Sequence, residues 1–157
     1  MGKEFYDTMP NAKAVIDLAS EQTGLDIPAI CFEENDTLNI TEYTQICMLA
    51  VEAAIYQAII DKGITPDVTA GLSLGEYGAL IASGAMTMAD AFAVVRKRGI
   101  YMQEAVPTGG AMTAVLGLDP QVIEDICKKT ADETNSVVSV ANYNCPGQIV
   151  ISGSIDA

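Results

Sequence analysis

Ser73 lies at the centre of a pattern that can carry nucleophilic chemistry. The segment Gly71-Leu72-Ser73-Leu74-Gly75 fits G-x-S-x-G, in which a strand turns sharply into a helix and exposes the serine at the apex. Residues 67–70 have the composition of a short buried strand and residues 76–83 that of a helix. Glycines suit such a turn because side chains at positions 71 and 75 are expected to collide with the incoming strand and the outgoing helix.

This arrangement predicts a serine that attacks an acyl group. The amide of Leu74 and the positive end of the following helix would lie beside the Ser73 hydroxyl, and both favour a developing oxyanion. A covalent acyl-serine intermediate is the chemistry expected of such a site. The alternative is an ordinary strand-to-helix turn in which the serine has no chemical role.

Composition sets the class of protein. The 157 residues are 50% hydrophobic, which is enough to bury a core in one domain or slightly more than one. The four cysteines are scattered without a C-x-x-C pair, a pattern typical of reduced, mostly buried thiols in a cytoplasmic protein. The first residues lack the apolar segment of a signal peptide.

The charge of the chain limits the kinds of partner that it can bind. A net charge of −13 argues against nucleic acid, because the phosphates would be repelled. Five of the eight basic residues lie in the clusters 96–98 and 128–129, so local anion binding remains possible. The apolar run 46–60 is interrupted by Glu52 and Gln57 and is too short to cross a bilayer comfortably. We therefore expect a buried helix and no membrane partner.

The remaining elements follow from periodicity, caps and breakers. Thr87 and Asp119 are expected to cap helices, Gly24 to end one, and residues 39–42 to form a capping box. Pro107 and Gly109-Gly110 mark the clearest domain boundary. The predicted helices are residues 3–9, 10–23, 27–32, a long helix from the capping box to 62–63, 76–83, 88–105 and 120–130; the predicted strands are 67–70, 111–116, 137–142 and 148–152.

Four stretches together resemble a known enzyme family. They are GLSLGEY at 71–77, RKRG at 96–99 followed by MQEA at 102–105, GAM at 110–112 and NYNCPGQ at 142–148. In this order they resemble the malonyl-CoA:acyl carrier protein transacylases of fatty acid synthesis and, more distantly, the acyltransferase domains of polyketide synthases. The resemblance spans essentially the whole chain and is more specific than the serine motif alone.

The resemblance implies an α/β fold in two parts. Residues 1–106 would form part of an α/β-hydrolase-like core with a nucleophile elbow. Residues 107–157 would form the first part of a ferredoxin-like small subdomain of the split β-α-β type, and their strand-helix-strand-strand order agrees with this. The small subdomain would be incomplete.

The resemblance also assigns catalytic roles. Ser73 matches the serine that takes a malonyl group from coenzyme A and passes it to the phosphopantetheine thiol of acyl carrier protein. Leu74 matches the residue whose amide forms half of the oxyanion hole. Arg98 matches the arginine that holds the malonyl carboxylate, a task that suits the two parallel donors of a guanidinium.

Three amides complete the implied substrate site. Gln45 resembles a glutamine that lines the entrance, and Asn142 and Asn144 match asparagines near the acyl group and pantetheine. A plain hairpin loop would equally explain the two asparagines. The substrate is malonyl-CoA and the protein partner is acyl carrier protein, and no metal or cofactor is expected.

The chain departs from the family in two respects. The family's general base is a histidine downstream of the serine, and this chain has no histidine. A glycine- and glutamine-rich loop that supplies the second oxyanion donor in the family has no counterpart here. We therefore interpret the chain as an internal piece of a transacylase with negligible transfer activity unaided.

Other functions remain open. A serine esterase of the α/β-hydrolase type would also need a histidine and would give Arg98 no role. A patatin-like acylhydrolase needs only Ser and Asp, but none of the aspartates here precedes a glycine. A module that binds acyl groups or carrier protein without catalysis is the alternative from a different class.

Overall fold

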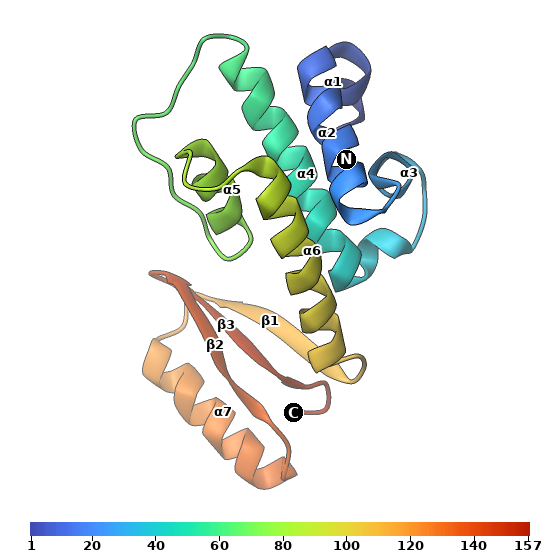
Figure 1. Ribbon diagram of the computed structural model, residues 1–157. Helices are drawn as coiled ribbons and strands as arrows, with labels where there is room; N and C mark the ends of the chain where they lie inside the picture. The colour runs from blue at the N-terminus through green and yellow to red at the C-terminus, as the bar shows by residue number, and fades with distance from the viewer. The chain divides into compact units, whose positions relative to one another are not determined.

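The computed structural model describes residues 1–157 and divides them into two compact units, Met1–Ala105 and Val106–Ala157 (Figure 1). The first unit consists of helices, and the second combines one helix with a three-stranded sheet, so the chain is α/β as predicted. The elements in chain order are α1 (Lys3–Thr8), α2 (Pro10–Thr23), α3 (Ile27–Phe32), the 3₁₀ helix η1 (Thr37–Asn39), α4 (Thr41–Ile60), α5 (Gly75–Ala82), α6 (Met88–Ala105), β1 (Gly110–Leu116), α7 (Pro120–Thr134), β2 (Val138–Cys145) and β3 (Gln148–Ser154).

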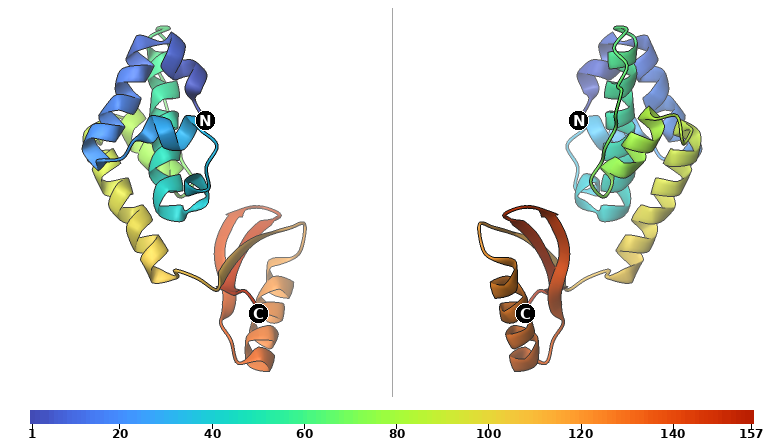
Figure 2. Two further views of the ribbon diagram at one scale, coloured as in Figure 1. Left: turned by 90° about the vertical axis from the view of Figure 1, so that its right-hand side faces the viewer. Right: turned by 90° about the vertical axis from the view of Figure 1, so that its left-hand side faces the viewer.

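Helix α4 is the centre of the first unit, with α2 and α6 packed along it (Figures 1 and 2). By length and composition it could cross a membrane, a test that core helices of soluble proteins also pass. In this structure one side of α4 is buried in the core, whereas Met48 and Ile59 on other sides are exposed, so the predicted buried helix is confirmed on one side only. The largest fully buried side chains of the core are Phe92, Ile16, Ile27, Ile46, Leu49, Val95 and Cys47.

Three of the four predicted caps are confirmed. Gly24 ends α2 with a left-handed φ of 70°, the Thr87 hydroxyl accepts a hydrogen bond from the Asp90 amide at 3.1 Å, and Asp119 accepts from the Gln121 amide at 2.9 Å. The predicted capping box at residues 39–42 does not form. Ile40 is the N-cap of α4, and its apolar side chain cannot accept a hydrogen bond, while Asn39, the predicted cap, lies in η1.

The predicted strand at residues 67–70 is also wrong. These residues follow α4 as an irregular segment, and Val68 is 86% exposed. A strand needs a neighbour for its backbone hydrogen bonds, and Met1–Ala105 contains no other strand. The segment is held instead by the Thr69 hydroxyl, which donates to the Ala79 carbonyl of α5 at 3.1 Å.

In the second unit the sheet order is β1-β3-β2 with antiparallel neighbours, and α7 covers one face (Figure 2). Ile123 and Cys127 of α7 pack on Ile149 of β3. Pro146 and Gly147 form the β2–β3 turn, where Gly147 has a φ of 81° that suits glycine. The predicted strand-helix-strand-strand order is confirmed, and α7 runs four residues longer than expected.

Phe92 should dominate the stability of the first unit, because its ring is fully buried between the packed helices. We expect Phe92→Ala to lower the free energy of unfolding by about 3–5 kcal/mol through lost burial and a residual cavity. Val94→Ala, on the exposed side of the same helix, should change it by no more than about 0.5 kcal/mol. Urea unfolding followed by circular dichroism measures both; equal effects would contradict this account of the core.

Candidate active site

Ser73 occupies a strained turn between the irregular segment and α5. Its φ of 53° is in the left-handed region, which costs a non-glycine residue about 1–2 kcal/mol. Backbone bonds close the turn on both sides, from the Gly75 amide to the Leu72 carbonyl at 2.9 Å and from the Glu76 amide to the Ser73 carbonyl at 3.4 Å. The serine side chain is therefore held outward, and it is exposed.

Steric crowding requires only one of the two glycines of the motif. A Cβ at Gly71 would lie 2.0 Å from the Gly75 carbonyl oxygen, so the backbone of the turn leaves no room for a side chain there. The predicted clash at Gly75 is wrong, because a Cβ at that position meets nothing within 4 Å. Gly75 is already the first residue of α5, and a side chain there would point into open space.

Leu74 presents its backbone amide beside the serine. Its side chain is 8% exposed and anchors the turn in the core, and the residue is the N-cap of α5. The Leu74 N–H has no acceptor within the chain, as is usual for the orphan donors at a helix start. An oxyanion at Ser73 would find this N–H and the positive end of α5 close by.

The guanidinium of Arg98 points at the serine. Its Nη2 donates to Ser73 Oγ at 3.0 Å, and its Nη1 donates to Gln45 Oε1. The Tyr77 ring of α5 lies 5.9 Å from the guanidinium carbon. Three predicted site residues, carried by α4, α6 and the turn before α5, thus meet at one point.

Asn142 and Asn144 belong to the second unit. Asn142 is exposed where β2 shifts register against β3, and Asn144 Nδ2 donates to Gln148 Oε1 at 3.1 Å. The hydrogen bond within the hairpin gives Asn144 a structural role of its own. Participation of the two asparagines in the site stays a prediction.

Arg96 was not predicted as a site residue, and the sequence marks it only as part of the basic cluster 96–98 and of the matching stretch RKRG. Its guanidinium pairs with Glu42 Oε1 at 3.5 Å and donates to the Glu42 carbonyl at 3.1 Å, whereas its neighbour Lys97 is exposed. The available signal was Gly99 within a helix, since an interior glycine often marks close packing. A Cβ at Gly99 would lie 2.8 Å from the Glu42 carbonyl oxygen.

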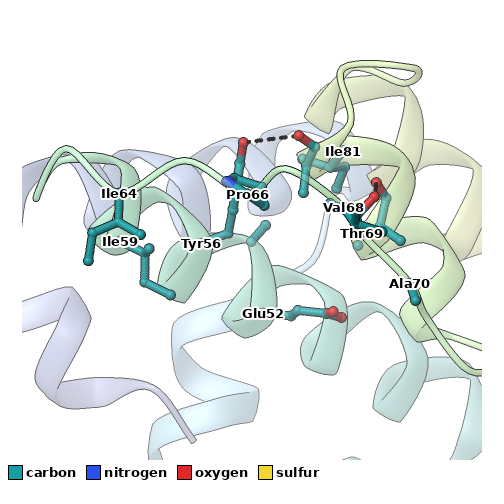
Figure 3. Close-up of a pocket in the computed structure, with 13 residues that line it drawn as sticks. Glu52, Tyr56, Ile59, Ile64, Pro66, Val68, Thr69, Ala70 and Ile81 are labelled. Atoms are coloured by element: carbon teal, nitrogen blue, oxygen red, sulfur yellow. Dashed lines mark hydrogen bonds between the residues drawn. The ribbon is translucent and has the colours of Figure 1, made fainter.

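A separate pocket of about 340 Å³ lies behind the turn, between α4, α5 and the segment before the elbow (Figure 3). Its lining is mostly apolar, and Tyr56 crosses it to donate to the Ala82 carbonyl at 3.3 Å. Glu52 lies at its α4 wall, and partial burial raises the pKa of this carboxyl above its ordinary value. Neither Ser73 nor Arg98 lines this pocket.

The site can hold an anion but has no base for the serine. The hydrogen-bond partner of Ser73 Oγ is the Arg98 guanidinium, which is a permanent donor. The chain has no histidine to take the serine proton. Within these residues the arrangement therefore combines an exposed hydroxyl, a backbone N–H without an acceptor and a guanidinium that contacts the hydroxyl.

Comparisons with known proteins match the chain over nearly its whole length. A family model described as the acyl transferase domain matches residues 1–157. The malonyl CoA-acyl carrier protein transacylase of Bacillus subtilis (strain 168) is 46% identical over 156 residues, which cover 98% of this chain and 49% of the relative. The chain spans about half the length of the curated relatives it matches.

Solved structures are similar over the same range. MCAT from Streptococcus pneumoniae is 50% identical, with a TM-score of 0.86 over 99% of this chain and 51% of that one. The malonyl-transacylase PlMCAT, solved in complex with the type II PKS acyl-carrier protein AntF, is 38% identical, with a TM-score of 0.87 and coverage of 99% and 51%.

The two motif glycines form a matched pair for testing the turn. We expect Gly71→Ala to lower the free energy of unfolding by about 1–3 kcal/mol, because the turn must open to admit the methyl group. Gly75→Ala should stay within about 1 kcal/mol of the parent, since its space is free and alanine favours a helix. Thermal unfolding compares the two; equal losses would contradict the steric difference between the two positions.

Glu52 should make stability depend on pH. Because burial raises its folded-state pKa, the favourable contribution of the protonated form is complete below the unfolded pKa and is lost as pH rises through the folded value. Glu52→Gln should therefore be more stable than the parent at pH 7, and the difference should close in acid. Chemical unfolding across this pH range tests the sign, and a parent more stable at pH 7 would refute it.

Proposed function

The chain belongs to the acyl transferase domain family, and from that premise we propose that its site takes a malonyl group from coenzyme A for an acyl carrier protein. Ser73 Oγ attacks the thioester carbonyl, the carbon–sulfur bond breaks, and coenzyme A leaves with its thiol protonated. The phosphopantetheine thiol of the carrier then attacks the malonyl ester and regenerates the serine hydroxyl. This is covalent, ping-pong catalysis.

The observation that carries the proposal is the hydrogen bond of 3.0 Å between Arg98 Nη2 and Ser73 Oγ. The free carboxylate of a malonyl ester is separated from its carbonyl by a single methylene group. A guanidinium that reaches the hydroxyl is therefore close enough to bind this carboxylate, with two charge-assisted hydrogen bonds. Gln45 Oε1 holds the opposite side of the guanidinium and directs it toward the ester.

The remaining roles follow from the same geometry. The Leu74 amide would stabilise the tetrahedral oxyanion as one donor, and Asn142 and Asn144 are assigned to the acyl and pantetheine groups by resemblance. We assign the second oxyanion donor and the general base to residues outside these 157, because the chain has no histidine. The unaided chain should therefore bind substrate and transfer it very slowly.

The finer description of the fold is part of this proposal. We assign Met1–Ala105 to an α/β-hydrolase-like core and Val106–Ala157 to the first part of a ferredoxin-like subdomain. The elbow at Ser73 supports the first assignment, and the antiparallel order β1-β3-β2 with α7 on one face supports the second. The four free thiols are consistent with a cytoplasmic location.

The competing functions explain less of the site. An esterase or acylhydrolase that takes neutral substrates has no use for a cation fixed against its nucleophile. A module that binds without catalysis would need no histidine, but it gives the Ser73 hydroxyl beside Arg98 no chemical role. Acylation of Ser73 separates that module from an enzyme.

Binding and acylation test the proposal directly. We expect malonyl-CoA to bind better than acetyl-CoA, and Arg98→Lys to weaken malonyl-CoA about tenfold by losing one charge-assisted bond. Isothermal titration measures binding, and intact-mass spectrometry with malonyl-CoA and holo acyl carrier protein follows the serine ester. Transfer should be slower than in intact relatives by about 10²–10⁴-fold for want of a base.

Ser73→Ala serves as the control, since it should bind malonyl-CoA and never acquire the ester. Equal binding of malonyl-CoA and acetyl-CoA would exclude the carboxylate role of Arg98. Turnover near that of an intact transacylase would contradict the missing base. Hydrolysis of a neutral ester that is unaffected by Arg98→Lys would favour an esterase.

A further inference from the structure

Arg96 and Arg98 leave α6 on opposite sides of the stripe that packs on α4. Val95 and Gly99 are buried and lie on this stripe. Because successive helical residues are rotated by about 100°, Arg96 and Arg98 project to its two flanks. One guanidinium reaches Glu42 and the other reaches Gln45, so the two arginines hold α4 from both sides.

The contacts of Arg96 with the start of α4 are well defined. Nη2 lies 3.5 Å from Glu42 Oε1, and Nη1 donates to the Glu42 carbonyl at 3.1 Å. The side chains of Arg96 and Glu42 are only 19% and 22% exposed, so this ion pair is screened less than an ordinary surface pair. The guanidinium carbon also lies 5.2 Å from the centre of the Tyr43 ring, within range of a cation–π contact.

The backbones of the two helices meet at the same place. A Cβ at Gly99 would lie 2.8 Å from the Glu42 carbonyl oxygen and 3.0 Å from its Cα. Glu42 and Gln45 are three residues apart in the first turns of α4, so they move together as one rigid segment. A contact that fixes Glu42 against α6 therefore also fixes the distance between Gln45 and Arg98.

We propose that Arg96 is a positioning residue that aims Arg98 at the serine through the start of α4, an inference that rests on the proposed function. Without the Arg96 pair, the first turn of α4 can move away from α6 and take the Gln45 acceptor with it. Arg98 then loses the partner on one side of its guanidinium and turns toward solvent. A shift of about 1 Å at such a site is enough to reduce catalysis strongly.

The test uses substitutions that remove the same charge from the same helix. Arg96→Gln removes the ion pair with Glu42. Lys97→Gln is the matched control because Lys97 is exposed. The first measurement is the ratio of the dissociation constants of acetyl-CoA and malonyl-CoA, in which general effects of charge on coenzyme A cancel. We expect Arg96→Gln to lower this ratio about fivefold, or ~1 kcal/mol, as for residues in one network; Lys97→Gln should leave it unchanged.

A second measurement needs no substrate. Phenylglyoxal reacts with arginine side chains, and peptide mass spectrometry gives the rate at Arg98 alone. An arginine held between Ser73 and Gln45 should react slowly, and Arg96→Gln should raise its rate about fivefold if the two arginines are coupled by ~1 kcal/mol. Arg96→Lys, which keeps the charge without the planar fork, should fall between the parent and Arg96→Gln.

The double variant Arg96→Gln/Arg98→Lys separates positioning from general loosening. If Arg96 acts through Arg98, the double variant binds malonyl-CoA no more weakly than Arg98→Lys alone. Additive losses, or an unchanged rate of phenylglyoxal modification at Arg98 in Arg96→Gln, would overturn the proposal.

If Arg96→Gln fails to fold, Glu42→Gln takes its place, because it removes the carboxylate and keeps the carbonyl acceptor. If the parent binds malonyl-CoA and acetyl-CoA equally, the proposed function is refuted. The rate at which phenylglyoxal modifies Arg98 would still test whether Arg96 positions Arg98.

Discussion

The contact between the Arg98 guanidinium and the Ser73 hydroxyl depends on how closely α6 packs on α4. The hydroxyl is presented by a turn of left-handed φ, and the guanidinium comes from a helix that shares no backbone bond with this turn. The packing of α5 and α6 on α4 brings the two together. Gly99 permits that packing because its missing side chain lets α6 approach the backbone of Glu42. The geometry of the site is therefore set by the helix core.

The sequence predicts the helices better than the segment at 67–70 because their signals are local. Helix α6 has the predicted bounds Met88–Ala105, since Thr87 supplies a cap at one end and Pro107 limits the other. A strand depends on partners elsewhere in the chain, and residues 67–70 have none in Met1–Ala105. An apolar run alone cannot reveal whether such a partner exists.

The site is predictable where one motif carries its geometry and unpredictable where distant residues meet. The turn at Ser73 follows from glycine at position 71, which the backbone requires. The meeting of Arg98 with Gln45 joins residues 53 positions apart, and no local pattern encodes it; the family resemblance implied only that both residues belong to the substrate site. Arg96 belongs to a stretch that matches the family, but the resemblance gave it no role, and only the structure shows its ion pair with Glu42.

In the proposed transfer, these residues would bind the acyl group and leave the proton transfer to another group. Arg98 donates to Ser73 Oγ and can stabilise negative charge on that oxygen, yet it cannot accept the proton that must leave. The chain as a whole carries a charge of −13, so a fixed cation at the serine offsets a field that would otherwise repel a carboxylated thioester. Under the proposed function, recognition of the acyl group would depend on the packed pair α4 and α6, while the rate of transfer would depend on a base brought to the same hydroxyl.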